Sequence, residues 1–200
     1  MSTTFQRHAD EETSDSGIQM PQRILDIATH QYSIDILARR FEEYQANPSA
    51  THDQYPWAAR FVMGFPVSSW QRELAWNVGQ KSRFIFAVWA GADLGSYLTN
   101  DWSGSASDRT ALVENSDILI DGQQRLHSLE QYFLDQLAVP DVQGMPRVWS
   151  EIGNGERKRF LSTIFPHSSV SSDDEMALRR TYDLCALGVV PRTHDQRAAR

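Results

Sequence analysis

One segment of the sequence, residues 117–129, predicts a strand, a tight turn and a helix in direct succession. Residues 117–120 have the apolar character of a buried strand end, and the chain then turns through Asp121 and Gly122. One carboxylate, two amides and one guanidinium stand between the strand and the helix. Packing does not require such a polar group, whereas a phosphate-bearing ligand or a hydrolytic reaction would. Apolar residues spaced three and four apart indicate one helical face: Leu126, Leu129, Phe133 and Leu137.

Similar patterns place further elements along the chain. Residues 1–20 are polar and acidic, so we expect a flexible lead-in followed by a single domain over residues 21–200. Three more helices are expected, over residues 33–45, over residues 81–90, and from residues 173–174 towards Ala186. Residues 56–62 fit neither pattern. Strands are expected at residues 94–99, 147–152 and 160–165, with breaks or loops at 47–49, 64–66, 100–109, 140–146 and 168–172.

The size and composition of the chain limit the classes to which it can belong. Its 200 residues, 40% of them hydrophobic, suit one globular domain with a core of ordinary size. The longest apolar cluster, residues 84–92, is far shorter than the roughly 18 residues of a membrane span. The polar start of the chain is not a secretory signal, and the single Cys185 cannot form an internal disulfide. We therefore expect a cytoplasmic protein without membrane contact.

The formal net charge of -7 argues against a domain whose main task is to grip DNA phosphates. Such domains present a basic face. The acidic excess lies partly in residues 10–15 and 173–175, so a small cationic site around Arg72 and Arg125 remains compatible with this charge.

Residues 121–125 have the composition of an anion site at the start of a helix. Gly122 allows backbone angles that other residues adopt only with strain. The unpaired N–H groups of the following helix attract negative charge, and Arg125 adds a planar cation suited to phosphates. Gln123 and Gln124 can both donate and accept hydrogen bonds, so they can contact a base, a ribose or a water.

The carboxylate of Asp121 needs a separate explanation, because a bare carboxylate repels phosphates. It fits the site if it holds a divalent metal such as Mg²⁺, orients a water, or accepts bonds from N–H groups of its own loop. The local alternative is that Asp121 only caps the helix and that Arg125 pairs with a surface carboxylate.

A second polar group lies upstream, where Gln71 and Arg72 stand between Trp70 and Trp76. An amide and a guanidinium against an apolar wall could form a polar site, and an Arg can stack on an indole face. The structural alternative is that the tryptophans belong to the core and that Arg72 covers them with its aliphatic stem.

Other chemistry has little support in the sequence. The six histidines are scattered without the spacing of a zinc site, so each is interpreted as a surface residue. The chain has neither a Gly-x-x-x-x-Gly-Lys-Ser/Thr loop nor Gly-x-Ser-x-Gly, and Cys185 has no evident neighbouring base. P-loop phosphate binding and nucleophilic catalysis are therefore not expected.

These motifs together resemble a known family. Asp121-Gly-Gln-Gln-Arg-Leu126 after an apolar strand resembles the signature of the ParB/sulfiredoxin-like superfamily, and more narrowly the N-terminal domains of GmrSD-type modification-dependent restriction systems. Those domains also have an upstream Gln-Arg followed by a Trp, matched here by Gln71-Arg72 and Trp76. The likeness covers residues 65–195.

A third motif of that family is matched less closely, by residues 182–193. Ala186 stands where the family has Asn, and Val189 where it has a second Gly. If that Asn contributes to catalysis, this chain binds a nucleotide but turns it over poorly.

The resemblance implies an α+β fold with a small mixed sheet surrounded by helices. It also implies one pocket for nucleoside triphosphates, which such proteins hydrolyse, and the leading hypothesis is a Mg²⁺-assisted phosphohydrolase or nucleotide sensor. The catalytic candidates are Asp121, which would also hold the metal, with Gln124 and Arg125. The candidates for nucleotide and phosphate binding are Gln71, Arg72, Gly122, Gln123 and Arg125.

Two alternatives stay open at this point. Because a separate nuclease domain often cuts DNA in such systems, the chain could have DNA or a nuclease as its partner, or be a ParB-like DNA-binding protein or nuclease itself. The other alternative is an interaction module without catalytic activity, suggested by the small size and the altered third motif.

Overall fold

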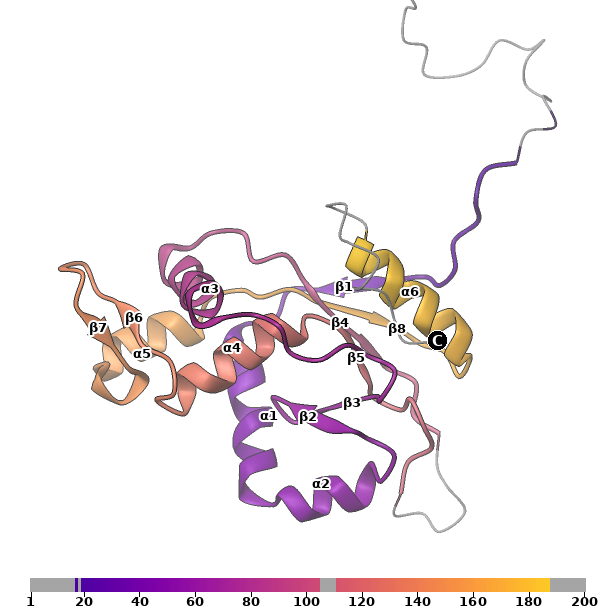
Figure 1. Cartoon of the computed structure of the whole chain (residues 1–200), viewed down its shortest axis with the longest axis horizontal. Helices are drawn as coiled ribbons and strands as arrows, with labels where there is room; N and C mark the ends of the chain where they lie inside the picture. Colours follow the sequence, from indigo (N-terminus) through magenta and orange to yellow (C-terminus); the bar gives the residue numbers. More distant parts are fainter. Residues whose placement is uncertain (1–16, 18, 105–110, 188–200) are drawn as a thin grey trace, which may run out of the picture.

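The computed structural model describes residues 17, 19–104 and 111–187 (Figure 1). The helices are α1 (Ile34–Ala46), α2 (Pro48–Gln54), α3 (Val78–Ala90), α4 (Gln123–Phe133), α5 (Asn154–Leu161) and α6 (Glu175–Leu187), with a 3-10 turn η2 (Trp149–Glu151). The strands are β1 (Ala28–His30), β2 (Arg60–Val62), β3 (Phe65–Val67), β4 (Tyr97–Asn100), β5 (Leu119–Asp121), β6 (Val139–Pro140), β7 (Pro146–Arg147) and β8 (His167–Val170). The protein therefore has the expected α+β composition.

Four of these strands form a mixed sheet in the order β1-β8-β4-β5. Strand β8 lies antiparallel to β1 and parallel to β4, and β4 lies antiparallel to β5. Two hairpins, β2–β3 and β6–β7, form separate small sheets. Because β5 stands at one end of the strand order, Asp121 at its last position lies at the margin of the sheet.

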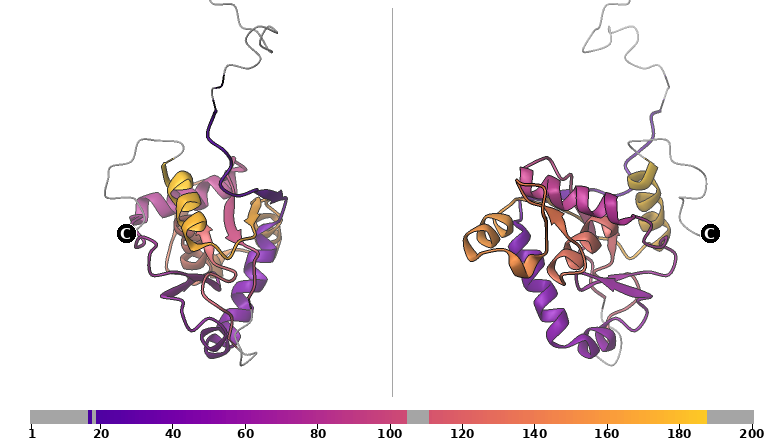
Figure 2. Two further views of the ribbon diagram at one scale, coloured as in Figure 1. Left: turned by 90° about the vertical axis from the view of Figure 1, so that its right-hand side faces the viewer. Right: turned by 60° about the vertical axis from the view of Figure 1, so that its left-hand side comes forward.

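Hydrophobic side chains cover both faces of the sheet. On β4 and β5, Tyr97 and Leu119 belong to a large core shared with α1, α3, α4 and α5, whereas Leu98 and Ile120 belong to a smaller core shared with α6. This alternation is the two-residue period of a strand. The left view of Figure 2 shows α6 and α1 on opposite sides of the strands. Helix α6 packs on β5, which brings its C-terminal half close to Asp121.

The helices predicted from the sequence are present, with only small shifts at their ends. Helix α1 occupies the predicted residues 33–45 with a shift of one residue. Asn77 and Gln80 form a capping box at the start of α3, and Gly91 ends that helix in the left-handed conformation, with φ of 70°. Asp174 caps α6 by accepting two backbone N–H groups at 2.8 and 3.2 Å.

The strand before residues 121–125 begins two residues later than predicted. Strand β5 includes Asp121, so Gly122 alone turns the chain into α4. Helix α4 ends at Phe133, and Leu137 is buried beyond the helix rather than on its face. The predicted strand over residues 94–99 is shortened in the same way, because β4 begins only at Tyr97.

Two predicted strands after α4 are wrong. Residues 147–152 contain only the end of β7 and the turn η2, and residues 160–165 begin as the last turn of α5. Phe160 and Phe165 are both buried, at 1% and 0% exposed, and their apolar character produced the strand-like pattern. A short apolar run cannot be assigned to helix or strand from its periodicity alone.

The predicted loop over residues 168–172 is also wrong, because its first three residues belong to β8. This strand pairs with β1 on one side and with β4 on the other. Ser168 and Ser169 are buried, and the Ser168 hydroxyl lies 2.9 Å from that of Thr29. Pairing on both sides satisfies the backbone, so the tertiary context outweighs the residue preferences.

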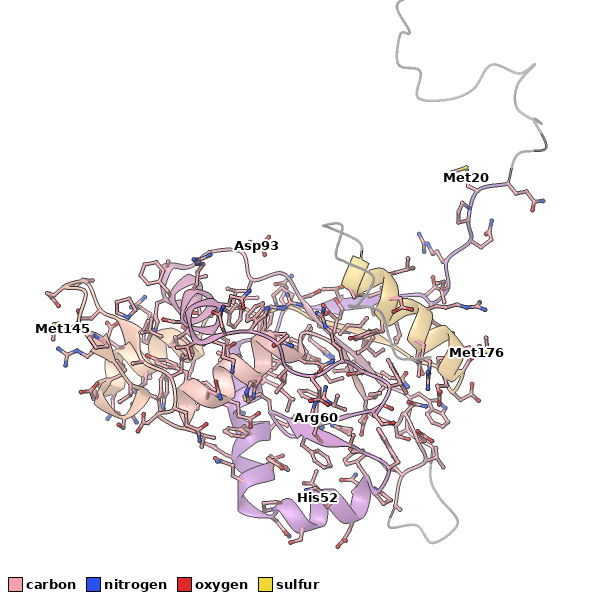
Figure 3. The ribbon with its side chains drawn as sticks, viewed as in Figure 1. Met20, His52, Arg60, Asp93, Met145 and Met176 are labelled. Carbon is pink, nitrogen blue, oxygen red and sulfur yellow. The ribbon has the colours of Figure 1, made fainter. Side chains whose placement is uncertain are left out.

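Two loops contain elements that the sequence pattern did not resolve. The end of the ambiguous residues 56–62 and the predicted turn at 64–66 belong to the β2–β3 hairpin, and Figure 3 labels Arg60 at the first position of this hairpin. The break at residues 47–49 ends α1 but also starts α2, because Asn47 accepts the N–H of Ala50 at 3.2 Å.

Two histidines are not surface residues, contrary to the prediction. The side chain of His127 on α4 is 19% exposed, and its pKa is lowered to about 4, chiefly by burial. His167 on β8 stacks on Tyr97, with ring centroids 4.8 Å apart, and burial lowers its pKa as well.

Among the described residues, every helix is too short or too polar to cross a bilayer.

Candidate functional site

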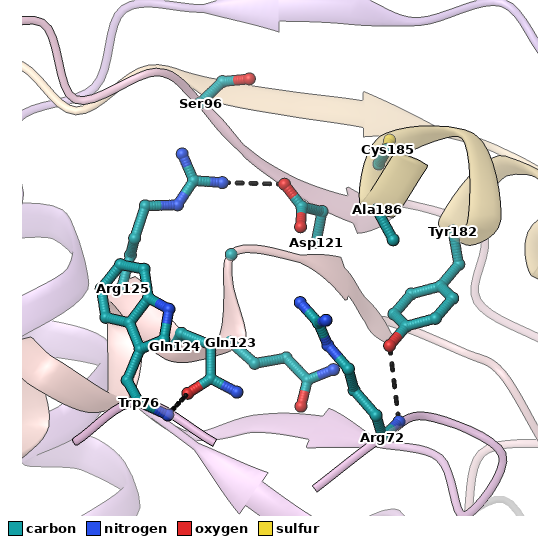
Figure 4. Close-up of a pocket in the computed structure, with 11 residues that line it drawn as sticks. Arg72, Trp76, Ser96, Asp121, Gln123, Gln124, Arg125, Tyr182, Cys185 and Ala186 are labelled. Carbon is teal, nitrogen blue, oxygen red and sulfur yellow. Dashed lines mark hydrogen bonds and ion pairs between the residues drawn. The ribbon is translucent and has the colours of Figure 1, made fainter. Parts of the chain in front are cut away.

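A cavity of about 460 Å³ lies where the start of α4, the segment before α3 and the end of α6 meet (Figure 4). Its lining combines residues from all three motifs recognised in the sequence. They are Arg72, Trp76, Ser96, Asp121, Gly122, Gln123, Gln124, Arg125, Tyr182, Cys185 and Ala186. Residues more than 100 positions apart in the chain therefore share one site.

The start of α4 opens into this cavity through Gly122. This residue has φ of 100°, and a Cβ atom there would lie 2.7 Å from the Cβ of Tyr97, so only glycine fits the turn. The first backbone bond of α4 runs from the N–H of Leu126 to the carbonyl of Gly122, and no side chain in the described ranges caps the helix. The earlier N–H groups of α4 are thus left for a ligand or water.

Arg125 lies in the first turn of α4 and is held in place at both ends of its guanidinium. Its Nη2 donates to Oδ2 of Asp121 at 2.8 Å, and its Nη1 donates to the carbonyl of Leu94 at 2.9 Å. Gly95 makes this close approach possible, because a Cβ there would lie 2.8 Å from Nη1. The partner of Arg125 is a carboxylate of the motif itself, rather than the surface carboxylate considered from the sequence.

Arg72 enters the cavity from the segment before α3, and its guanidinium points towards the start of α4 (Figure 4). Its backbone is held by two side chains. The N–H donates to the hydroxyl of Tyr182 at 3.4 Å, and the carbonyl accepts from Nη2 of Arg60 at 2.6 Å. Within the described residues, the guanidinium of Arg72 has no hydrogen-bond or ion-pair partner, so it remains available to an anion.

Gln71 does not line the cavity, although it is part of the same motif. It is 3% exposed, and its amide nitrogen donates to the carbonyl of Leu119 at 2.7 Å. Its amide oxygen accepts from Nε2 of Gln123 at 2.8 Å, and Oε1 of Gln123 accepts from Arg60 at 2.7 Å. Gln71 and Gln123 therefore connect the two Gln-Arg segments, residues 71–72 and residues 123–125, behind the cavity wall.

Gln124 connects the same two segments at a second point. Its Oε1 accepts the backbone N–H groups of Ala75 and Trp76 at 3.1 and 3.0 Å, and its Nε2 donates to the carbonyl of Glu73 at 3.3 Å. The amide of Gln124 is thus largely occupied in holding residues 73–76, although the residue borders the cavity.

The charge of the cavity lining is positive although the whole chain is acidic. Two guanidinium groups face one carboxylate among the lining residues, which leaves one net positive charge. Desolvation and the nearby Asp121 carboxylate raise the pKa of the Cys185 thiol to about 11, so the thiol stays neutral at physiological pH. Burial likewise raises the pKa of Tyr182. The unpaired backbone N–H groups at the start of α4 contribute further positive potential, so the site is complementary to an anion.

The third motif contributes to the same cavity through α6. Tyr182 is buried, packs edge-to-face on Trp70 with centroids 5.6 Å apart, and contacts the backbone of Arg72. Ala186 borders the cavity with its small side chain. Val189 and the remainder of the motif lie outside the described residues, as do residues 1–16.

Among the described residues, one carboxylate in the lining of this cavity could hold a divalent metal. Asp121 is the only carboxylate in the lining, and its Oδ1 has no hydrogen-bond partner within the described residues. The described ranges contain no group of three or more His, Cys, Asp or Glu side chains placed to hold a metal. Mg²⁺ commonly takes one or two carboxylates together with phosphates and waters, so Asp121 fits such an ion only in combination with a ligand.

Two residues important for this geometry had no signal in the sequence. Arg60 lies in β2, outside every recognised motif, and reaches both Gln123 and the carbonyl of Arg72. Gly95 lies in the loop before β4 and makes room for Arg125. Neither position could be connected to the site without knowing how β2 and β4 lie beside α4.

Comparison of the chain with protein-family models, curated proteins and solved structures finds no match. The resemblance to the ParB/sulfiredoxin-like superfamily therefore stays a prediction from the sequence motifs.

Proposed function

We propose that this cavity binds the phosphates of a nucleoside triphosphate and that the protein is a metal-assisted phosphohydrolase or a nucleotide sensor. One observation carries the proposal: the guanidinium groups of Arg72 and Arg125 and the uncapped start of α4 converge on a single cavity. A helix start alone is a common feature. Its combination with two arginines from distant segments is what favours a phosphate ligand.

In this proposal the two arginines have different tasks. The guanidinium of Arg72 has no hydrogen-bond or ion-pair partner within the described residues and makes the first contact with the phosphates. Arg125 is already oriented by Asp121 and Leu94, so it offers a fixed positive charge where charge develops in the transition state.

Asp121 is the residue that would hold Mg²⁺. When bound, the ion would supply neutralisation of phosphate charge. The carboxylate of Asp121 also orients Arg125. A ligand phosphate that approaches Arg125 competes directly with this carboxylate.

Gln123 and Gln124 act in this proposal mainly as positioning residues. Their amide groups keep residues 71–76 against the start of α4, which places Arg72 opposite Arg125. Each amide has one N–H that no bond within the described residues occupies, and this hydrogen can still contact a phosphate, a sugar or a water.

The proposal is tested by phosphate release from ATP, GTP, CTP and UTP with and without Mg²⁺. We expect the wild-type protein to release phosphate from at least one of them, and the Arg72→Gln variant to lose about tenfold or more of this activity. Arg83→Gln on the exposed surface of α3 removes the same charge away from the cavity and is expected to retain the activity. A wild-type protein that neither binds nor hydrolyses any of the four would contradict the proposal.

A further inference from the structure

The lining of the cavity includes aromatic side chains in addition to its two arginines. Among the described residues, two aromatic side chains line it, Trp76 and Tyr182. The ring of Tyr182 is 3% exposed and is packed against Trp70, so it has no open face. Trp76 is only partly buried, which leaves part of its indole for contact with a ligand.

The position of Trp76 is fixed from two sides. Its ring packs against Phe84 of α3, with centroids 6.0 Å apart and planes inclined at 57°. Its backbone N–H donates to Oε1 of Gln124 at 3.0 Å. The same motif that forms the start of α4 thus also sets the place of the indole. In Figure 4, Trp76 and Arg125 lie at one side of the cavity, and Arg72 and Tyr182 lie at the other.

We infer that Trp76 is the stacking platform for the base of the ligand, so that the site takes nucleotides in preference to inorganic polyphosphate. This inference rests on the proposed phosphate site. An indole with an open part beside a cationic pocket suits a planar base, because stacking on aromatic side chains strengthens nucleic-acid binding substantially.

The surroundings of Trp76 also indicate how selective this platform is. The amide oxygen of Gln124 is occupied by the N–H groups of Ala75 and Trp76, and one N–H of its amide nitrogen is occupied by the carbonyl of Glu73. This amide therefore offers at most one N–H to the edge of a base. The hydroxyl of Ser96 also lines the cavity and has no bond to the described residues. A hydroxyl can both donate and accept a hydrogen bond, so it does not select one base edge. Stacking is open to all four bases, because every base has a stacking face, so we expect the site to require a base but to discriminate weakly among the four.

Isothermal titration of the full chain with inorganic tripolyphosphate and with the four nucleoside triphosphates tests the inference. For the wild-type protein we expect the four nucleotides to bind with Kd values within about fivefold of one another, and tripolyphosphate to bind roughly tenfold more weakly. The Trp76→Leu variant is expected to bind nucleotides as weakly as tripolyphosphate, with tripolyphosphate binding unchanged. Trp76→Phe, which keeps a smaller ring, is expected to restore part of the difference.

The control is Trp149→Leu, which removes a partly buried tryptophan that packs on the same core away from the cavity. It is expected to bind every ligand as the wild type does.

Two results would overturn the stacking role alone. One is equal binding of nucleotides and tripolyphosphate by the wild type, and the other is unchanged nucleotide binding by the Trp76→Leu variant. Strong preference for one base would overturn the weak discrimination. Failure of all five ligands to bind would overturn the phosphate site and the stacking role together.

Discussion

The carbonyl oxygen of Arg72 lies 2.6 Å from Nη2 of Arg60, and this contact connects the β2–β3 hairpin to the proposed phosphate site. The same Nη2 atom lies 2.7 Å from Oε1 of Gln123. The guanidinium of Arg60 therefore bridges the two Gln-Arg segments in addition to the bonds of Gln71 and Gln124, and the arrangement of the cavity depends in part on a residue that does not border it.

Replacing Arg60 by Met should weaken the fold and the site together. The side chain is 20% exposed, and its loss leaves Gln123 and the Arg72 carbonyl without their donor. We expect a loss of about 1–3 kcal/mol in the free energy of unfolding, measured by urea denaturation, and weaker phosphate binding. Arg39→Met, on the exposed face of α1, should cost less than about 0.5 kcal/mol. Equal losses in the two variants would contradict the bridging role.

Gly122→Ala should be far more harmful than the same change at Gly144. Both residues have positive φ, of 100° and 81°, so both substitutions carry backbone strain of about 1 kcal/mol. Only at Gly122 would the new Cβ clash with Tyr97, at 2.7 Å, whereas nothing lies within 4 Å at Gly144. Thermal denaturation of the two variants measures the difference. Similar melting temperatures would show that the turn at Gly122 tolerates a side chain.

Asp121→Asn should change binding and turnover in opposite directions. The substitution removes the carboxylate that competes with phosphates for Arg125, so tripolyphosphate should bind more tightly in the absence of Mg²⁺. Mg²⁺-dependent phosphate release should be lost, because the amide is a poor metal ligand and carries no charge. Glu42→Gln, on the exposed side of α1, supplies the control for the change in net charge. Unchanged phosphate release would remove Asp121 from the proposed chemistry.

His127 should make the protein less stable in mild acid. Its pKa is lowered from 6.5 to about 4 in the folded chain. Between these two pH values His127 is therefore protonated in the unfolded state but neutral in the folded state. Stability should fall by up to about 3 kcal/mol as the pH drops from 6.5 to 4, and this contribution should be constant above that window. Glu130 has a raised pKa and acts in the opposite direction.

The contribution of His127 is isolated by comparing urea denaturation of the wild type and of His127→Asn at pH 7.5 and pH 5. The difference in stability between the two proteins should shift in favour of the variant at the lower pH. A shift of zero would place the pKa of His127 near its ordinary value.

The parts of the site that could be predicted from the sequence are those determined by neighbouring residues. The turn at Gly122 and the helix that follows depend on local backbone angles and on the apolar period of α4, and both are present in the structure. The proximity of Arg72 and Arg125 was suggested by their repeated Gln-Arg pattern and is found in the cavity. The role of Gln124 in holding residues 73–76 depends on tertiary contacts and was not evident.

The fold was predicted least well where packing decides the structure. Ser168 and Ser169 form a central strand because β1 and β4 pair with them from both sides. Phe160 lies on a helix because its ring packs against Trp89, with centroids 4.7 Å apart. Neither pairing nor such ring contact can be read from the residues themselves.

A thermal-shift measurement tests most directly whether the cavity at the start of α4 binds nucleotide phosphates. Ligand binding to the folded state stabilises it by RT ln(1 + [L]/Kd), about 2.7 kcal/mol at a hundredfold excess over Kd. We expect Mg²⁺ with at least one nucleoside triphosphate to raise the melting temperature of the wild type by several degrees, about 2–4 °C per kcal/mol for a chain of this size. The same ligand should leave the Arg72→Gln/Arg125→Gln variant unshifted. A wild type that is not stabilised by any of the four nucleotides would contradict the claim.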